Sequence, residues 1–330
     1  MSKKNVAVVM GGFSDEYKVS LKSGQLIYDS LDRDLYNVYK VVVLKEEWYF
    51  LNENEEKLPI NKGDFSVTLS DGAILKFDVC FNIIHGAPGE NGELQGYWNA
   101  IGQKYTGCDF YKSALTFNKK DTLAVLAKYR IPSAKSFYLR KGENINEEKI
   151  VEELGLPLFV KPNQSGSSLG ISKVKAKSEL AAAIEFAFKE DDEILIESFL
   201  NGMEVSVGVI DYKGETIVLG ITEIVPHKEF FDYEAKYTTG VTNEITPGRM
   251  TEEEKARVEG AMLKIYNRLN CKGVVRIDYI LHQDTNLMYV LEVNTVPGQS
   301  QNSIIPQQVR ATGMSMTDFY GAIIEEALKK

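Results

Sequence analysis

Short apolar runs alternate with amphipathic stretches in the first third of the chain. Residues 6–10 (VAVVM) are apolar and end at two glycines, and the next stretch carries apolar residues at helical spacing. Short continuous apolar runs are typical of buried strands, and a strand, a glycine turn and a helix together open a Rossmann-like unit. Further strands are predicted at 38–44, 48–51, 77–84 and 104–107, with a helix at 94–101. The pattern predicts an α/β lobe that ends near residue 115.

The rest of the chain mixes helices with strands that do not alternate as regularly. Helices are predicted at 118–129, 147–154, 178–188, 252–269 and 316–328. Strands are predicted at 134–139, 157–161, 171–174, 193–197, 205–210 and 215–225. Ile131-Pro132 ends the first of these helices, because proline restricts the residue before it. A chain of 330 residues is typical of two to three domains.

A hairpin is predicted within residues 274–294, where two apolar runs flank four turn residues. Side chains alternate between the two faces of a strand, so one face gathers polar groups among apolar neighbours. Its predicted members are Arg276, Asp278 and Ile280 on the first strand and Val290, Glu292 and Asn294 on the second. A three-residue loop pairs Gln283 with Leu287 and sets Asp278 directly opposite Glu292.

This polar face has two interpretations. Unpaired carboxylates on a half-buried face are costly, and Mg²⁺ takes such oxygen ligands, usually one or two carboxylates together with substrate phosphates. The alternative is a ladder of salt bridges among Arg276, Asp278 and Glu292. The turn that follows, Asn294-Thr-Val-Pro-Gly298, favours the metal site because it brings backbone N–H groups next to the proposed ion.

Two loops rich in glycine and polar residues indicate a ligand site. Residues 85–96 (HGAPGENGELQG) follow a predicted strand, as does Glu16, and ligands of open α/β sheets bind beyond the carboxyl ends of strands. For His85 taken alone, a structural histidine is the favoured interpretation. Residues 161–170 (KPNQSGSSLG) begin with a lysine that ends an apolar strand, which favours a polyphosphate-binding flap over a linker. The loop is not a Walker A motif, because GxxxxGK[ST] is missing.

Composition limits the classes of binding partner and the cellular compartment that we expect for the protein. The net charge of −9 argues against nucleic acid or an anionic membrane as the main partner, and 44% hydrophobic residues are ordinary for a globular protein. No apolar segment is long enough for a signal-peptide core or a membrane span. Three cysteines without a CxxC motif are expected to be reduced, mostly buried thiols of a cytosolic protein. The absence of GxGxxG disfavours a dinucleotide oxidoreductase.

The order of these features resembles the D-alanine–D-alanine ligases of the ATP-grasp superfamily. The resemblance is carried by GGFSDEYKVS, HGAPGENGELQG, KPNQSGSSLGISKV, LIESFLNGMEVSV and NTVPGQSQNSIIP, and it runs from Gly11 to the final helix. It implies an α/β ATP-grasp fold, with an N-terminal Rossmann-like lobe (1–115) followed by two α+β lobes (116–200 and 201–330) that enclose ATP. It also implies a cytoplasmic homodimer that uses two Mg²⁺ ions, for which Mn²⁺ can substitute, in peptidoglycan precursor synthesis.

Matching motifs carry the family's roles to individual residues. The implied metal ligands are Asp278, Glu292 and Asn294, in agreement with the hairpin. The implied ATP-binding residues are Lys119, Lys161, Ser168, Glu197, Ser198, Leu200, Glu204 and Lys236, with Lys120 as an alternative to Lys119. The implied substrate-binding and catalytic residues are Glu16, His85, Ser167, Tyr237, Arg276, Gly298 and Ser303.

The family's reaction is ATP-dependent formation of D-alanyl phosphate, followed by attack of the second D-alanine. In it Glu16 binds the first ammonium, with His85 near the carboxylate, and Ser303 binds the second carboxylate. Tyr237 favours a dipeptide over D-alanyl-D-lactate, since related depsipeptide-forming ligases commonly carry phenylalanine there. Two alternatives remain: an ATP-grasp ligase for L-amino acids or a hydroxy acid, and a non-catalytic nucleotide-binding protein.

Overall fold

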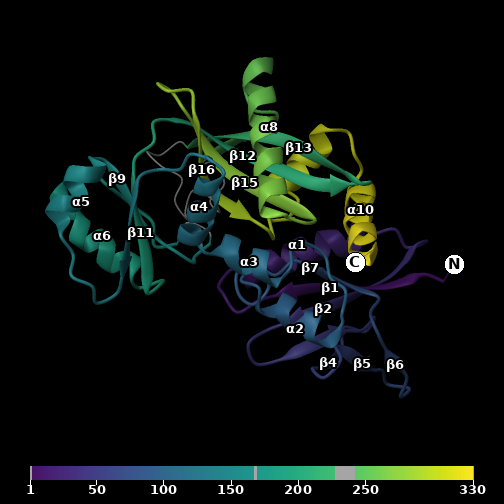
Figure 1. The fold of residues 1–330 in the computed structure, drawn as a ribbon. Coiled ribbons are helices and arrows are strands. Elements are labelled where there is room, and N and C mark those ends of the chain that lie inside the picture. The colour runs from purple at the N-terminus through teal and green to yellow at the C-terminus, as the bar shows by residue number, and fades with distance from the viewer. Residues whose placement is uncertain (1, 167–168, 227–241, 330) are drawn as a thin grey trace.

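The computed structural model describes residues 2–166, 169–226 and 242–329. Three sheets organise these residues, and Figure 1 shows them as three lobes around a common centre. The implied site residues Ser167, Ser168, Lys236 and Tyr237 lie outside the described residues. No helix in the described ranges is both long and apolar enough to cross a membrane.

The N-terminal sheet has the strand order β6-β5-β4-β3-β2-β1-β7. Its strands are β1 (Lys4–Gly11), β2 (Tyr36–Val43), β3 (Trp48–Leu51), β4 (Lys57–Asn61), β5 (Ser66–Thr68), β6 (Ile74–Leu75) and β7 (Val79–Asn82). The central strand β1 pairs in parallel with β2 and β7, while β3 to β6 extend the sheet as antiparallel hairpins. Helices α1 (Tyr17–Ser30) and α2 (Glu93–Ile101) belong to this lobe, which confirms the strand–turn–helix opening.

One expectation for this lobe was wrong, and two features of it were not predicted. The predicted strand at 104–107 is a single parallel bridge between Cys80 and Tyr105, because Gly107 takes a positive φ of 87° and turns the chain into the next helix. That helix, α3 (Phe110–Phe117), was not predicted; Asp109 caps it by accepting the backbone N–H of Lys112. The hairpins of β4 to β6 were also missed, since their apolar runs are very short.

The central sheet is antiparallel, with the order β10-β9-β11-β8. Its strands are β8 (Ser136–Arg140), β9 (Leu158–Pro162), β10 (Ser172–Val174) and β11 (Glu193–Ser198), and its helices are α5 (Glu147–Leu154), η1 (Lys177–Glu179) and α6 (Leu180–Ala187). A core between this sheet and the helices α5 and α6 includes Ile150, Val160, Leu180 and Ile196. Helix α4 (Lys119–Lys128) comes before β8 in the chain, and its Leu123 and Leu126 belong to the core of the C-terminal sheet. These elements match the predicted ones apart from the 3₁₀ turn that begins the third helix.

The C-terminal sheet is antiparallel, with the order β14-β13-β12-β15-β16. It comprises β12 (Gly202–Tyr212), β13 (Glu215–Pro226), β14 (Thr242–Ile245), β15 (Val274–His282) and β16 (Met288–Asn294), with helices α8 (Glu252–Leu269), α9 (Ile304–Ala311) and α10 (Met316–Lys329). Helix α8 packs its apolar side on this sheet, and its start is fixed by a capping box between Thr251 and Glu254.

The last helix, α10, connects the C-terminal lobe to the N-terminal lobe. Phe319, Tyr320 and Ile323 of α10 share one apolar core with Val6 and Val8 of β1, and the same core includes residues of β12 and β13. Figure 1 shows α10 standing between the C-terminal sheet and the N-terminal lobe. The N-terminal and C-terminal lobes are therefore held together by buried apolar side chains.

The β15–β16 hairpin confirms that Asp278 lies directly opposite Glu292. The expected pairing of Gln283 with Leu287 is wrong: Leu281 pairs with Met288, one step out of register, and the His282 N–H donates to the Leu287 carbonyl at 2.9 Å. A bulge between Asp278 and Tyr279 restores the predicted register at the Asp278–Glu292 pair.

The same bulge moves Val290 off the polar face, where it was predicted. Because the extra residue in β16 is Leu291, Val290 pairs with Tyr279 and lies in the apolar core with Ile277. Leu291 instead lines the cavity beside Glu292. A β-bulge adds one residue to one strand and so reverses the faces of the residues beyond it.

Candidate active site

A cavity of about 690 Å³ lies where the three lobes meet. Each implied site residue that the structure describes lines it: Glu16, His85, Lys119, Lys161, Glu197, Ser198, Leu200, Glu204, Arg276, Asp278, Glu292, Asn294, Gly298 and Ser303. These residues come from all three lobes and from positions nearly three hundred residues apart. A cavity of this size accommodates a nucleotide-sized ligand.

The polar face of the β15–β16 hairpin forms one wall of this cavity. The Arg276 guanidinium donates to both Asp278 oxygens, at 2.9 Å from Nε and 2.7 Å from Nη2, and reaches Glu292 Oε1 at 3.5 Å. Burial by itself lowers the pKa of Arg276, but the Asp278, Glu292 and Glu90 carboxylates outweigh it and raise the pKa further above its ordinary value. The salt-bridge ladder that the sequence allowed as the alternative is therefore present on this face.

The donor set on this wall suits a hard divalent ion. Asp278 also accepts a 2.6 Å bond from the Ser206 hydroxyl, and the Asn294 side-chain oxygen accepts the Val296 N–H at 3.0 Å, so two of the three residues that the resemblance implies as ligands are oriented by the protein. Within the described ranges no three His, Cys, Asp or Glu side chains cluster as a metal site. An ion here would depend on two carboxylates, the Asn294 carboxamide and ligand oxygens, which is the usual environment of Mg²⁺.

Two buried lysines face the same cavity. Lys119 Nζ donates to the Ser165 carbonyl at 2.8 Å and lies 3.5 Å from Glu292 Oε2. Lys120 instead stacks over the Tyr138 ring at 4.3 Å and does not line the cavity, so of the two candidates Lys119 has the position suited to a ligand. Lys161 Nζ lies 2.7 Å from Glu197 Oε2.

Glu16 lines the cavity from the N-terminal lobe. It follows β1 and lies against the 161–170 loop: a Cβ added to Gly166 would stand 2.7 Å from Glu16 Oε2. Glycine therefore allows the loop to approach this carboxylate closely. The family resemblance also implies a hydrogen-bonded trio of Glu16 with Ser167 and Tyr237, and these two residues lie outside the described ranges.

His85 is buried at the junction of the lobes. Its Nδ1 lies 2.9 Å from the Val296 carbonyl oxygen, and its Nε2 lies 3.4 Å from the Ser23 hydroxyl. Burial lowers the pKa of His85 despite the nearby Glu16 carboxylate. In this arrangement both ring nitrogens have partners within the protein.

Glu90 is a cavity residue that the motif analysis did not single out. Its Oε2 accepts the Gly86 N–H at 2.9 Å, and its side chain is buried. Burial, with a smaller contribution from the Glu16 charge, raises the pKa of Glu90 to about 8. A carboxylate between two glycines in HGAPGENGELQG was a signal that could have identified it.

The turn after β16 carries Gly298, and α9 begins just beyond it. Ser303 precedes the first residue of α9, and its Oγ accepts the Ser300 N–H at 3.0 Å. Gly298 packs against this side chain, since a Cβ there would stand 3.0 Å from Ser303 Oγ. The free backbone N–H groups at a helix N-terminus favour an anion.

Comparisons with known proteins agree with this geometry. Two family models match, D-ala D-ala ligase N-terminus over residues 5–108 and D-ala D-ala ligase C-terminus over residues 125–325. A D-alanine–D-alanine ligase of Flavobacterium psychrophilum is 56% identical over 326 residues, which cover 99% of this chain and 98% of the relative.

Two solved structures extend the likeness to the fold. The VanG D-Ala:D-Ser ligase from Enterococcus faecalis has 31% identity and a TM-score of 0.85, and the match covers 99% of this chain and 100% of that one. The D-alanine–D-alanine ligase from Bacillus anthracis complexed with ATP has 29% identity and a TM-score of 0.78, over 100% of this chain and 98% of that one. This chain, with its ATP-grasp fold, therefore belongs to the D-alanine–D-alanine ligase family.

Proposed function

We propose that this protein joins two D-alanines to D-alanyl-D-alanine at the expense of ATP, for peptidoglycan precursor synthesis. The observation that carries the proposal is one cavity lined by a carboxylate from the N-terminal lobe (Glu16), two buried lysines (Lys119 and Lys161) and the Arg276–Asp278–Glu292 wall. An amino acid needs a carboxylate for its ammonium, and a polyphosphate needs cations. The names of the relatives supply the identity of the amino acid.

The reaction takes two steps. A carboxylate oxygen of the first D-alanine attacks the γ-phosphorus of ATP, and the bond to the ADP oxygen breaks. The amine of the second D-alanine then attacks the carbonyl carbon of D-alanyl phosphate, loses a proton, and phosphate leaves with the electron pair of the C–O bond. Water would hydrolyse the acyl phosphate, so the enclosed cavity protects the intermediate.

The amino-acid half of the site uses Glu16 for the first ammonium. His85 lines the same cavity, also from the N-terminal lobe. Arg276 and the Gly298 N–H stabilise the oxyanion that forms when the second amine attacks, as charge-stabilising donors do in acyl transfer. Ser303 and the N-terminus of α9 receive the second carboxylate. Ser167 and Tyr237 keep the roles that the family implies, with Tyr237 favouring the dipeptide.

The nucleotide half uses Lys119 and Lys161 for the phosphates and the segment from Glu197 through Ser198 to Leu200 for adenine. Glu204 binds the ribose hydroxyls, and Lys236 and Ser168 complete the set by analogy with the family. Asp278, Glu292 and Asn294 fit two Mg²⁺ ions, or Mn²⁺ in their place. When bound, the ions neutralise phosphate charge during phosphoryl transfer.

Three wider features belong to the same proposal. The domains are taken as residues 1–115, 116–200 and 201–330, supported by the division of the strands among three sheets. A homodimer rests on the family alone, and analytical ultracentrifugation tests it. A cytoplasmic location follows from the dependence on ATP.

The decisive experiment measures phosphate release from ATP and Mg²⁺ with D-alanine, L-alanine, D-alanine plus D-serine, and D-alanine plus D-lactate. Products are resolved by mass at near-neutral pH. Release with D-alanine alone, yielding the dipeptide, supports the proposal. Phosphate release only with another pair of substrates would leave the ATP site intact but reject the roles of Glu16 and Ser303. A product that is mainly the D-lactate ester would reject the role of Tyr237.

A further inference from the structure

The turn between β16 and α9 is held by side chains from distant parts of the chain. Within the turn, Asn294 accepts the Val296 N–H at 3.0 Å. From the N-terminal lobe, His85 binds the Val296 carbonyl at 2.9 Å, and the Ser23 hydroxyl accepts the Gln299 N–H at 3.1 Å. Gly298 lies between these two attachment points, so its backbone N–H direction depends on both.

Ser23 itself connects the two attachments. It lies on α1, is fully buried, and contacts both the Gln299 N–H and His85 Nε2. A carbonyl oxygen only accepts, so His85 Nδ1 must carry the proton that binds Val296. In the neutral ring Nε2 is then an acceptor, and the Ser23 hydroxyl donates to it while accepting from Gln299.

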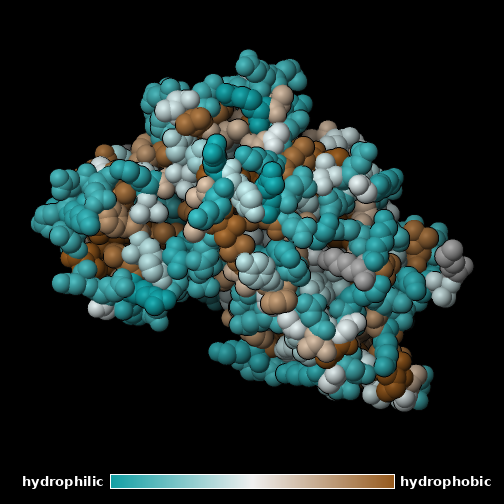
Figure 2. Space-filling model, viewed as in Figure 1, coloured by the Kyte–Doolittle hydropathy of each residue, from teal (hydrophilic) through white to brown (hydrophobic). Residues whose placement is uncertain are grey.

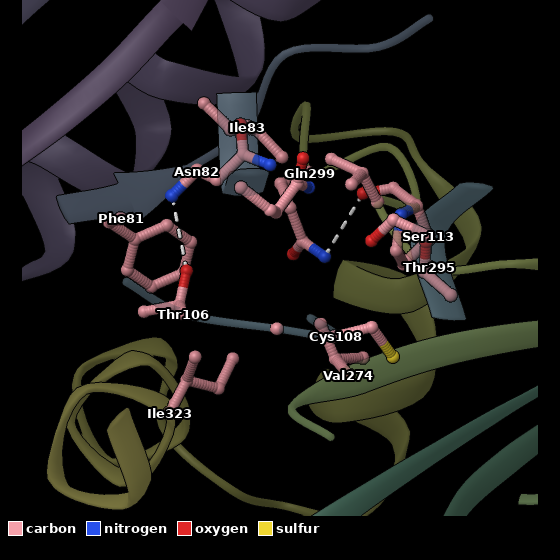
Figure 3. Close-up of a pocket in the computed structure, with 14 residues that line it drawn as sticks. Phe81, Asn82, Ile83, Thr106, Cys108, Ser113, Val274, Thr295, Gln299 and Ile323 are labelled. Carbon is pink, nitrogen blue, oxygen red and sulfur yellow. Dashed lines mark hydrogen bonds between the residues drawn. The ribbon is translucent and has the colours of Figure 1, made fainter. Parts of the chain in front are cut away.

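Behind this turn, Val296 packs in the apolar core that the N-terminal and C-terminal lobes share. A cavity of about 20 Å³ lies there, between the lobes. Figure 3 shows Asn82 and Thr106 of the N-terminal lobe on one side of it and Thr295 and Gln299 of the turn on the other. Gln299 is further held by the Tyr320 hydroxyl, at 3.2 Å from its Oε1.

We propose that Ser23 is a positioning residue that orients the Gly298 N–H toward the reacting carbonyl group. It does so by holding Gln299 directly and His85 as the Nδ1–H tautomer. The catalytic part of this inference rests on the proposed ligase function, whereas the hydrogen-bond arrangement does not. His85 then serves to clamp the turn, because it has no ring nitrogen left for a substrate carboxylate.

Ser20 provides a matched control on the same helix. It is also fully buried on α1 and also makes two hydrogen bonds, accepting the Gly11 N–H at 2.9 Å and donating to the Ile83 carbonyl at 2.7 Å. Its bonds stay within the N-terminal lobe. Ser20→Ala therefore removes a comparable hydroxyl without releasing the turn.

The first test needs no catalysis. Long-range ¹H–¹⁵N NMR of the imidazoles in the unmodified protein should show His85 as the Nδ1–H tautomer at neutral pH, and the chain has only three histidines to assign. Amide hydrogen exchange should accelerate at Gln299 in Ser23→Ala and at Gly11 in Ser20→Ala. An Nε2–H tautomer, or unchanged Gln299 exchange in a folded Ser23→Ala protein, overturns the arrangement.

The second test measures kinetics. Ser23→Ala should lower kcat by about 10- to 100-fold, the range expected for a misplaced catalytic group, with the KM for ATP changed less than about twofold. Ser20→Ala should have a distinctly smaller effect on kcat at a similar loss of Tm. Equal kcat losses in the two variants would make Ser23 merely structural. If neither the variant nor the unmodified protein makes dipeptide, the ligase proposal fails while the NMR and exchange results still decide the arrangement.

Discussion

Lys161 Nζ lies 2.7 Å from Glu197 Oε2, across adjacent strands β9 and β11, and both side chains are more than nine-tenths buried. A buried ion pair contributes little net stability compared with apolar residues, but removing one partner leaves an uncompensated charge. This pair also faces the cavity, where Lys161 is assigned to phosphate. Its stability role and its binding role can therefore be separated by mutation.

Lys161→Met should destabilise the protein by about 3–5 kcal/mol, because Glu197 is left buried without its partner. The double variant Lys161→Met/Glu197→Gln should recover most of that loss in urea unfolding, while ATP binding stays weak. The exposed Lys4–Asp78 pair, at 3.2 Å, is the control and should contribute less than about 1 kcal/mol. Absence of recovery in the double variant would contradict the buried-charge explanation.

Glu292→Gln should raise the Mg²⁺ concentration needed for half-maximal ADP formation by at least about tenfold, since even second-sphere changes have effects of that size. Chelation with EDTA should abolish activity, and added Mg²⁺ should restore it. Asp284→Asn, an exposed carboxylate at the tip of the same hairpin, is the control. If both variants need the same Mg²⁺ concentration for half-maximal ADP formation, Glu292 is not a metal ligand.

Glu90→Gln should flatten the pH dependence of stability between about pH 4.5 and 8. Because burial raises the pKa of Glu90 to about 8, the folded state keeps a proton that the unfolded state has released. The folded state then binds more protons, so stability falls as pH rises through this window, by at most about 1.4 kcal/mol per pH unit from this group.

Denaturant unfolding of both proteins at pH 6, 7 and 8 measures the difference. The variant cannot ionise, yet its amide oxygen can still accept the Gly86 N–H. It should lose less stability with rising pH than the unmodified protein does. Parallel stability curves would mean that Glu90 is ionised in the folded protein throughout.

Arg276→Lys should lower kcat by about 10²- to 10³-fold, the usual cost of removing an oxyanion donor. Lysine presents a point charge and cannot reproduce the two bonds to Asp278 and the reach toward the reacting group. Arg249→Lys is a comparison variant with the same bonding pattern but a mostly exposed side chain: Arg249 holds a carboxylate, Glu223, through Nε at 2.8 Å and Nη2 at 2.6 Å. Comparable kcat losses in the two variants would remove Arg276 from the catalytic role.

Local patterns in the sequence determined most of the elements and the identity of the site. Alternation along β15 requires only local backbone geometry, so Arg276 and Asp278 could be assigned to one face from the residues alone. Dense motifs around Glu16, Lys161 and Gly298 likewise identified residues that line one cavity. These signals depend on neighbours within a few positions, which is why they can be read without coordinates.

Register and long-range contacts required the tertiary structure. The hairpin loop was predicted one step out of register, and only the bulge at Leu291 restored the Asp278–Glu292 pair while turning Val290 into the core. A bulge is selected by packing on both faces of the sheet, not by the residues of one strand.

The junction of the lobes illustrates the same limit. Ser23 and Gln299 are 276 positions apart, and their contact depends on α10 binding the N-terminal sheet through a shared apolar core. The chemistry of each residue was evident from its type. The packing of the three lobes decides which side chains come into contact and how deeply each is buried. It therefore also decides their pKa values, because desolvation and hydrogen bonding are properties of the assembled surroundings.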